Sequence, residues 1–186
     1  MGFYEMQKVV AFLRAINVGG HTVKMADLRT LFDSMGCRNV ETFIASGNVI
    51  FDSEEENNHR LEAKIEQTLI QALGYQVVTF IRTTTEVAQI AAYKPFPREE
   101  IDRAGHNLYI AFLPDKPGEN ARRKLETFTT EIDEFHINGR EVYWLCRKNM
   151  SESEFSGALL EKTLGMPATL RNSKTIIKIA AKYNER

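Results

Sequence analysis

The sequence predicts an α+β fold built from two copies of a βαββαβ unit, the ferredoxin-like order that RRM domains share, with mostly antiparallel sheets. Three observations favour this fold. Strand-like and helix-like segments follow one another in the same order twice along the chain. Short stretches of sequence recur in both halves in matching order. The chain has 186 residues, which is enough for two small domains.

The first half alternates hydrophobic runs with segments of helical periodicity. The run KVVAFLRAI at 8–16 predicts a strand, and apolar residues at helical spacing predict a helix over 25–35 that ends at Gly36. A second helix over 58–73 is stopped by Gly74. The remaining segments are strands at 39–45, 48–53 and 76–82 and a short trailing helix at 84–92.

After a polar stretch with two prolines at 94–106, which we interpret as a linker, the same order begins again. Asn138-Gly139 is a strong signal for a two-residue hairpin turn. The expected strands are 107–113, 132–137, 140–146 and 168–172, and the expected helices are 118–128, 153–164 and 174–183. We therefore expect one repeat with its trailing helix at 6–93 and a second with a C-terminal helix at 107–186.

Three sequence echoes favour a duplication. VAFL at 10–13 returns as IAFL at 110–113. IAA at 90–92 returns at 179–181, with Tyr93 directly after the first copy and Tyr183 two positions after the second. FIASGNVIF at 43–51 matches FHINGREVY at 135–143 at an offset of 92, which aligns Gly47 with Gly139. Each echo is short, but their shared order supports two related units.

Composition limits the classes of function. Hydrophobic residues make up 43% of the chain and charged residues 26%, and no apolar run is long enough to cross a membrane. The formal net charge of -1 gives no general attraction to nucleic acid. The N-terminus lacks the pattern of a secretory signal, so we expect a cytoplasmic protein. In that compartment Cys37 and Cys146 should be free thiols.

The stretch LRAINVGGH poses the main functional question. In a ferredoxin-like sheet, the end of the first strand lies at the edge where the second and third strands turn over. The residues expected near one another are Arg14, Asn17, Gly19, Gly20, Ser46, Gly47 and Asn48. Glycine amides beside a helix start, with a guanidinium, could bind an anion. The alternative is plain turn chemistry, because NVGGH matches neither the dinucleotide fingerprint nor the P-loop.

Three motifs in this order resemble a bacterial family catalogued as domain of unknown function 1697: LRAINVGGHTVKMADLRTLF, TFIASGNVIFDS and TLRNSKTIIKIAAKY. The resemblance spans Lys8 to Tyr183 and implies two ferredoxin-like repeats, but no activity. The family motifs fall on Arg14, Ile16, Asn17, Val18, Gly19 and Gly20, on Ser46, Gly47 and Asn48, and on Thr169, Arg171, Asn172 and Thr175.

The resemblance adds Arg171 and Asn172 to the candidate ligand-binding residues. The chain departs from the family pattern at Glu154, where a lysine is expected, and at Ser173, where a tryptophan is expected. Because Glu154 replaces a positive charge with a negative one, an anion contact at this position is in doubt. We then expect Ser153 to be a helix N-cap.

Other chemistry finds little support. The four histidines are scattered without ligand spacing, so we expect no metal and no cofactor, and only His21 lies near the glycines as an acid or base. Two hypotheses remain: a protein that binds a small anionic molecule, which could be an enzyme, and a protein-interaction or RNA-binding module. Nucleic acid ranks lower because the first strand is apolar on both faces. The sequence leaves the substrate, the reaction and the oligomeric state open.

Overall fold

The computed structural model describes residues 6–17, 19–44 and 47–183. These residues form two compact units: the first runs to Val87 and includes Tyr183, and the second is Ala88–Lys182. The first contains β1 (Gln7–Leu13), α1 (Met25–Ser34), β2 (Arg38–Thr42), β3 (Asn48–Ser53), α2 (Asn58–Leu73) and β4 (Thr79–Thr83). α3 (Thr84–Ala92) continues from the first unit into the second.

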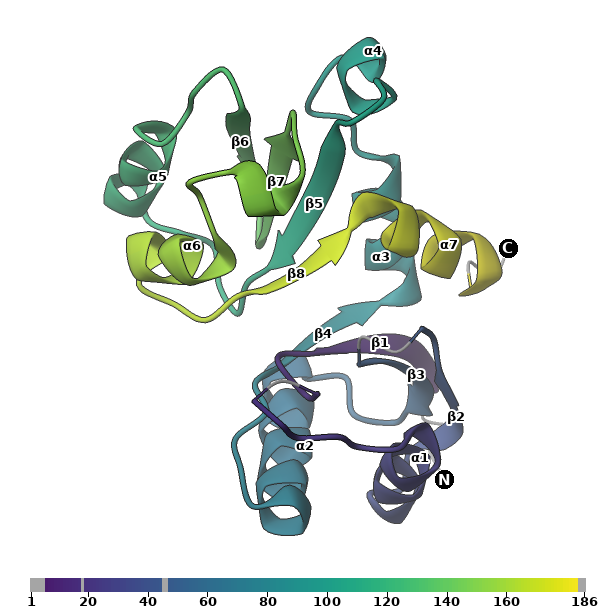
Figure 1. Ribbon diagram of the computed structural model, residues 1–186. Helices are drawn as coiled ribbons and strands as arrows, with labels where there is room; N and C mark the ends of the chain where they lie inside the picture. The colour runs from purple at the N-terminus through teal and green to yellow at the C-terminus, as the bar shows by residue number, and fades with distance from the viewer. Residues whose placement is uncertain (1–5, 18, 45–46, 184–186) are drawn as a thin grey trace. The chain divides into compact units, whose positions relative to one another are not determined.

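The second unit repeats this order. It contains α4 (Arg98–Ile101), β5 (Asn107–Phe112), α5 (Glu119–Glu126), β6 (Asp133–Asn138), β7 (Glu141–Cys146), α6 (Gly157–Leu164), β8 (Thr169–Asn172) and α7 (Ser173–Tyr183), whose last residue counts with the first unit. Both sheets are four-stranded and antiparallel, with the orders β2-β3-β1-β4 and β6-β7-β5-β8. The expected α+β arrangement of two similar units is confirmed (Figure 1).

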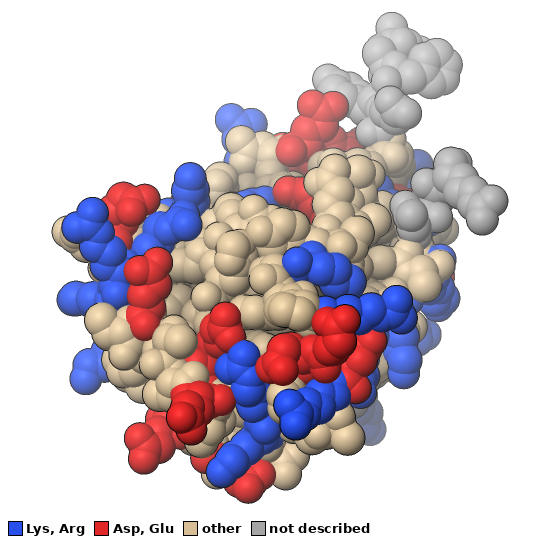
Figure 2. Space-filling model, turned by 90° about the horizontal axis from the view of Figure 1, so that it is seen from above, with Lys and Arg blue, Asp and Glu red and all other residues tan. Residues whose placement is uncertain are grey.

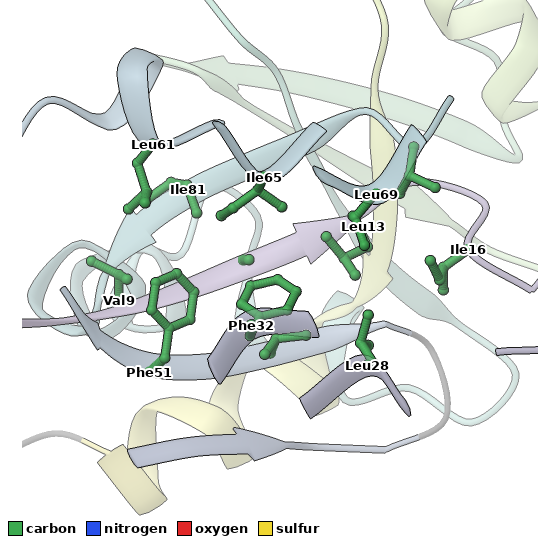
Figure 3. Packing of buried hydrophobic residues seen from close by; sticks show 13 residues of the cluster. Val9, Leu13, Ile16, Leu28, Phe32, Phe51, Leu61, Ile65, Leu69 and Ile81 are labelled. Carbon is green, nitrogen blue, oxygen red and sulfur yellow. The ribbon is translucent and has the colours of Figure 1, made fainter. Parts of the chain in front are cut away.

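The core of the first unit lies between its sheet and the helices α1 and α2 (Figure 3). Leu28 and Phe32 lie one turn apart on α1, and Leu61, Ile65 and Leu69 repeat at the same spacing on α2, so each helix presents one apolar stripe. All five are at most 3% exposed. Burying one such side chain contributes about 1.5–3 kcal/mol, so these stripes hold both helices on the sheet.

The opposite face of this sheet is also buried. Val10, Phe12 and Phe80 are 0% exposed and Ile50 is 2% exposed. They alternate along their strands with residues that pack on the helices. β1, whose sequence is apolar on both faces, is therefore buried on both faces.

The second unit has an aromatic core on the face covered by α5 and α6. Trp144 is fully buried and lies against Phe155 and Phe135. Its indole Nε1 donates a hydrogen bond of 2.7 Å to Oδ1 of Asp133, and the hydroxyl of Ser153 donates to the other oxygen at 2.7 Å. The buried carboxylate therefore joins β6, β7 and the segment before α6.

Carboxylates of α2 protect the outer edge of β4. Glu66 accepts a hydrogen bond from the backbone amide of Thr79, and Glu62 accepts one from that of Ile81, both at 2.8 Å. The two glutamates lie one helical turn apart, which matches the spacing of alternate residues on a strand. These bonds satisfy amides that an edge strand otherwise leaves open.

The sheet register corrects the alignment of the two halves by one residue. The amide of Leu13 donates to the carbonyl of Gly47, and the amide of Leu113 donates to that of Arg140, both at 2.9 Å. Gly47 therefore corresponds to Arg140 rather than to Gly139. The turn prediction shifts as well, because Asn138 pairs with Glu141 and leaves Gly139 and Arg140 as the loop.

Several expected boundaries are wrong for physical reasons. β1 stops at Leu13 because the backbone turns out of the strand at Ala15, whose φ is 56°. The helix expected over 153–164 begins only at Gly157, with the Ser156 side chain accepting from the amide of Leu159 as N-cap. Ser153, expected as the N-cap, instead bonds to Asp133. Within the polar stretch at 94–106, Phe96 is buried and α4 forms.

Each trailing helix leads to a tyrosine that bonds to an outer strand. After α3, the hydroxyl of Tyr93 lies 2.7 Å from Nε2 of His136 on β6, within the second unit. At the end of α7, the hydroxyl of Tyr183 donates to Oε2 of Glu41 on β2 at 2.7 Å, within the first unit. The last residues of α3 therefore belong to the second unit, and Tyr183, the last residue of α7, belongs to the first. None of the described helices is long and apolar enough to traverse a lipid bilayer.

Candidate functional site

The loop after β1 leaves the sheet at a sharply defined point. Ala15 has a φ of 56°, which turns the chain away from β1. Ile16 is then 3% exposed and packs into the first core, and its carbonyl accepts a hydrogen bond of 2.8 Å from the Tyr75 hydroxyl. The start of the loop is therefore anchored to both the core and the segment that follows α2.

The glycine part of the loop is exposed but closed by two contacts. The Asn17 side chain accepts a hydrogen bond of 2.8 Å from the amide of Val23. The ring of His21 stacks on the ring of Tyr75, with centroids 3.9 Å apart. Between these contacts Gly19 and Gly20 have φ values of 72° and 86°, which glycine adopts readily. Val18, which lies in the same motif, is outside the described residues.

The β2–β3 hairpin meets this loop through Gly47. A Cβ atom on Gly47 would lie 2.7 Å from Cγ2 of Ile16 and 3.2 Å from Cβ of Leu13, and φ at Gly47 is 74°. The buried Asn48 forms two hydrogen bonds of 2.9 Å with Phe43. Its side-chain amide donates to the Phe43 carbonyl, and the Phe43 backbone amide donates to the Asn48 carbonyl. Ser46 lies outside the described residues.

Gly47 of the second motif therefore lies against Ile16 of the first. The nearness of Arg14, Gly19 and Gly20 to the hairpin stays a prediction from the sequence. Asn17, Gly47 and Asn48 have structural roles there, since each closes or packs a turn. Arg14 is half-buried at the base of the loop, while the glycine backbone is exposed.

Two residues of this edge have a backbone conformation that is unfavourable for their type. Ala15 has a φ of 56°, and Ile44, in the hairpin, has a φ of 60° with half of its side chain exposed. A left-handed conformation costs a residue other than glycine about 1–2 kcal/mol. Such strain gathers where surrounding contacts hold a functional geometry in place.

Arg171 is a buried arginine of β8, and it has a counterpart that sequence reasoning missed. Its Nη1 donates to the carbonyl of Leu170 at 2.9 Å, and Nη1 of Arg82 donates to the carbonyl of Ile81 at 2.8 Å. Val10 on β1 pairs with Arg82, and Ile110 on β5 pairs with Arg171, so the two arginines hold equivalent positions. The signal was present as FIRT at 80–83 and TLRN at 169–172.

Burial lowers the pKa of Arg171 without removing its charge at neutral pH. It is 7% exposed, and desolvation lowers its pKa to about 10, so the guanidinium stays charged at neutral pH. Nη1 also donates to Oγ1 of Thr169 at 2.8 Å. Arg171 belongs to the second unit and Arg14 to the first, so a pocket that includes both stays a prediction from the sequence.

Asn172 lines a cavity of about 240 Å³ in the second unit. Its side chain accepts a hydrogen bond of 2.9 Å from the amide of Lys174 at the start of α7. Arg103 and His106, on the loop before β5, line the same cavity. Asn172 therefore lies at a surface hollow that is also lined by Asp102, Arg103 and Lys174, and its side chain caps the start of α7.

A larger cavity of about 560 Å³ lies in the first unit, among the end of α1, β2 and the start of α2. Its wall contains Cys37 and Lys64, neither of which the sequence marked as functional. Nζ of Lys64 donates to the carbonyl of Met35 at 2.8 Å. Desolvation raises the pKa of Cys37 to about 11, so its thiol stays protonated at neutral pH and is a poor nucleophile.

The distribution of charge and of potential metal ligands adds no further centre within the described residues. No three His, Cys, Asp or Glu side chains gather in these ranges in a way that could hold a metal ion. On the face in Figure 2, basic and acidic side chains alternate around an area without charges, in keeping with the net charge of -1.

Comparisons with known proteins identify a family but no activity. The chain is similar in structure to the conserved bacterial protein SP0830 from Streptococcus pneumoniae, with a TM-score of 0.71, 22% sequence identity and coverage of 97% of this chain and 100% of that one. At this identity the similarity concerns the fold. A search among curated proteins finds no match. The family model described as "Protein of unknown function (DUF1697)" matches residues 6–143, and the chain therefore belongs to this family.

Proposed function

We propose that the protein binds a small anionic molecule at the loop Arg14–Gly20, beside the β2–β3 hairpin with Ser46, Gly47 and Asn48. The observation that carries the proposal is that Tyr75 contacts the chain on both sides of the glycine pair. Tyr75 bonds to Ile16 and stacks on His21, so the described residues on either side of the exposed glycines are held in place before a ligand binds. Preorganisation lowers the entropy that a ligand must lose from the protein on binding.

The chemistry of the loop suits an anion. Amides next to glycines can be approached closely because no Cβ shields them, and nothing lies within 4 Å of the position of a Cβ on Gly20. Arg14 would add a permanent positive charge with several donors. The left-handed φ values of Ala15 and Ile44 are compatible with the same interpretation, since strained backbone occurs at ligand sites as well as in turns.

Binding of RNA on an open sheet face has less support. An RRM needs exposed aromatic side chains on its central strands, which here are β1 and β3. The corresponding outward positions carry Val10, Phe12, Asn48 and Ile50, which are at most 2% exposed. A protein interface remains the alternative that the exposed Ile44 would favour.

A titration of the full chain with simple anions tests the proposal. Phosphate, ribose 5-phosphate and citrate would be followed by calorimetry and thermal shift at low and high salt. We expect saturable binding of at least one anion, weakened about tenfold or more in Arg14→Gln, because a charge-assisted hydrogen bond contributes about 1.5–3 kcal/mol.

Arg60→Gln is the matched control. It removes the same charge from an exposed arginine at the other end of α2, about 20 Å along the helix from Tyr75. Binding should be unchanged in this variant. Absence of saturation with every anion, or equal weakening by both substitutions, would reject the site.

We also propose that the chain is a tandem duplication of a ferredoxin-like unit, with repeats at 6–93 and 107–186. The identical strand orders and the equivalent positions of Arg82 and Arg171 support a common origin.

A further inference from the structure

We infer that the anionic ligand carries a flat aromatic ring, and that His21 is the platform on which this ring stacks. The inference rests on the proposed anion site and names the class of its ligand: a nucleotide or another small molecule that joins an aromatic ring to a phosphate.

The platform consists of two stacked rings. His21 is exposed, and its ring lies on that of Tyr75 with an interplanar angle of 22°. Because Tyr75 covers one face of the imidazole, the exposure of His21 concerns the other face and the edge. A flat ring with one covered and one open face is the arrangement that proteins use to stack nucleic-acid bases.

The platform is rigid. The Tyr75 hydroxyl donates to the carbonyl of Ile16, and Ile16 itself is buried in the core. Tyr75 also packs against this core with its own ring. The position of His21 is therefore tied to the fold rather than to the loop alone, and a stacked ligand would not have to order it.

The platform adjoins the glycine backbone. A Cβ on Gly19 would lie 4.0 Å from Cδ2 of His21, so the edge of the imidazole borders the glycine pair. A ligand that places an anionic group on the glycine amides would have its next group over or beside the imidazole. A phosphate joined to a base through one sugar has this layout.

The alternative is that the His21–Tyr75 stack only closes the loop. In that case the ring matters for the shape of the loop and makes no contact with a ligand. The two interpretations differ in a measurable way, because a platform distinguishes ligands with a ring from ligands without one, and a loop closure does not.

The test compares AMP with ribose 5-phosphate, which share the phosphate and the sugar, by calorimetry on the full chain. We expect AMP to bind about tenfold more tightly, since stacking of one base contributes about 1–3 kcal/mol. In His21→Ala the preference should fall to about unity while ribose 5-phosphate still binds, and in His21→Phe, which keeps a flat ring, the preference should persist.

The outcomes separate the two proposals. Equal binding of AMP and ribose 5-phosphate to the unaltered protein would overturn the platform and leave the anion site intact. A preference for AMP that survives in His21→Ala would place the base elsewhere and would also overturn it. If neither ligand nor inorganic phosphate binds at millimolar concentration, both the platform and the anion site are rejected.

Discussion

Substitution of Gly47 by alanine tests the contact that joins the hairpin to the loop after β1. The new Cβ would lie 2.7 Å from Cγ2 of Ile16 and 3.2 Å from Cβ of Leu13, both of which belong to the buried core. The backbone amide of Leu13 is bonded to the Gly47 carbonyl, so neither strand can move away freely. The substitution therefore adds steric conflict to an unfavourable φ of 74°.

The expected loss of stability has two parts. A left-handed conformation costs alanine about 1–2 kcal/mol relative to glycine. Forcing an extra methyl group into a packed core costs about 1–3 kcal/mol more. The free energy of unfolding should therefore fall by about 2–5 kcal/mol.

Urea unfolding followed by far-ultraviolet circular dichroism measures this loss, and Gly20→Ala is the matched control. Gly20 has a φ of 86° but open space where the Cβ would be, so only the backbone part of about 1–2 kcal/mol should appear. Equal losses in the two variants would refute the close contact between hairpin and loop.

A second-site substitution sharpens the test. Ile16→Leu removes the methyl group on Cβ that the alanine would meet, and alone should cost less than about 1.5 kcal/mol. The double variant with Gly47→Ala should recover part of the stability, and strict additivity of the two losses would contradict the steric explanation.

Three further predictions concern other parts of the chain. Burial raises the pKa of Cys37 from 9.0 to about 11, which lowers the thiolate fraction at pH 8 about 100-fold. The greater nucleophilicity of a more basic thiolate offsets this loss about tenfold. An aromatic disulfide reagent should therefore label Cys37 roughly tenfold more slowly in the native than in the urea-unfolded chain. The same shift means that the stabilising effect of the protonated thiol is complete below pH 9 and lost as the pH rises toward 11, and equal labelling rates would contradict both statements. Asp133→Ala should lower the free energy of unfolding by about 1–3 kcal/mol, because the indole nitrogen of the buried Trp144 loses its acceptor, and an unchanged urea midpoint of the tryptophan fluorescence would refute this. Asn57→Ala should cost about 1 kcal/mol in urea unfolding through loss of the cap on Arg60 at the start of α2, while Asn57→Ser should restore most of it.

The sequence by itself determined the order of the elements and the edge at which the first strand ends beside a hairpin turn. The helix at 58–73 and the strand at 48–53 have the predicted bounds, because apolar periodicity and a terminal glycine are local signals. The sequence also indicated that the end of the first strand shares an edge with the turn between the second and third strands, and the bond from the Leu13 amide to the Gly47 carbonyl confirms this.

Only the tertiary structure decided the features that depend on distant residues. The stack of His21 on Tyr75 joins residues 54 positions apart, and no sequence pattern near either residue predicts the contact. The bond from Tyr183 to Glu41 and the equivalence of Gly47 with Arg140 depend likewise on strand register and on packing between elements. A local pattern predicts which face of a helix or strand is apolar, but it does not predict which side chain lies against that face. That contact depends on how all elements of the core pack together.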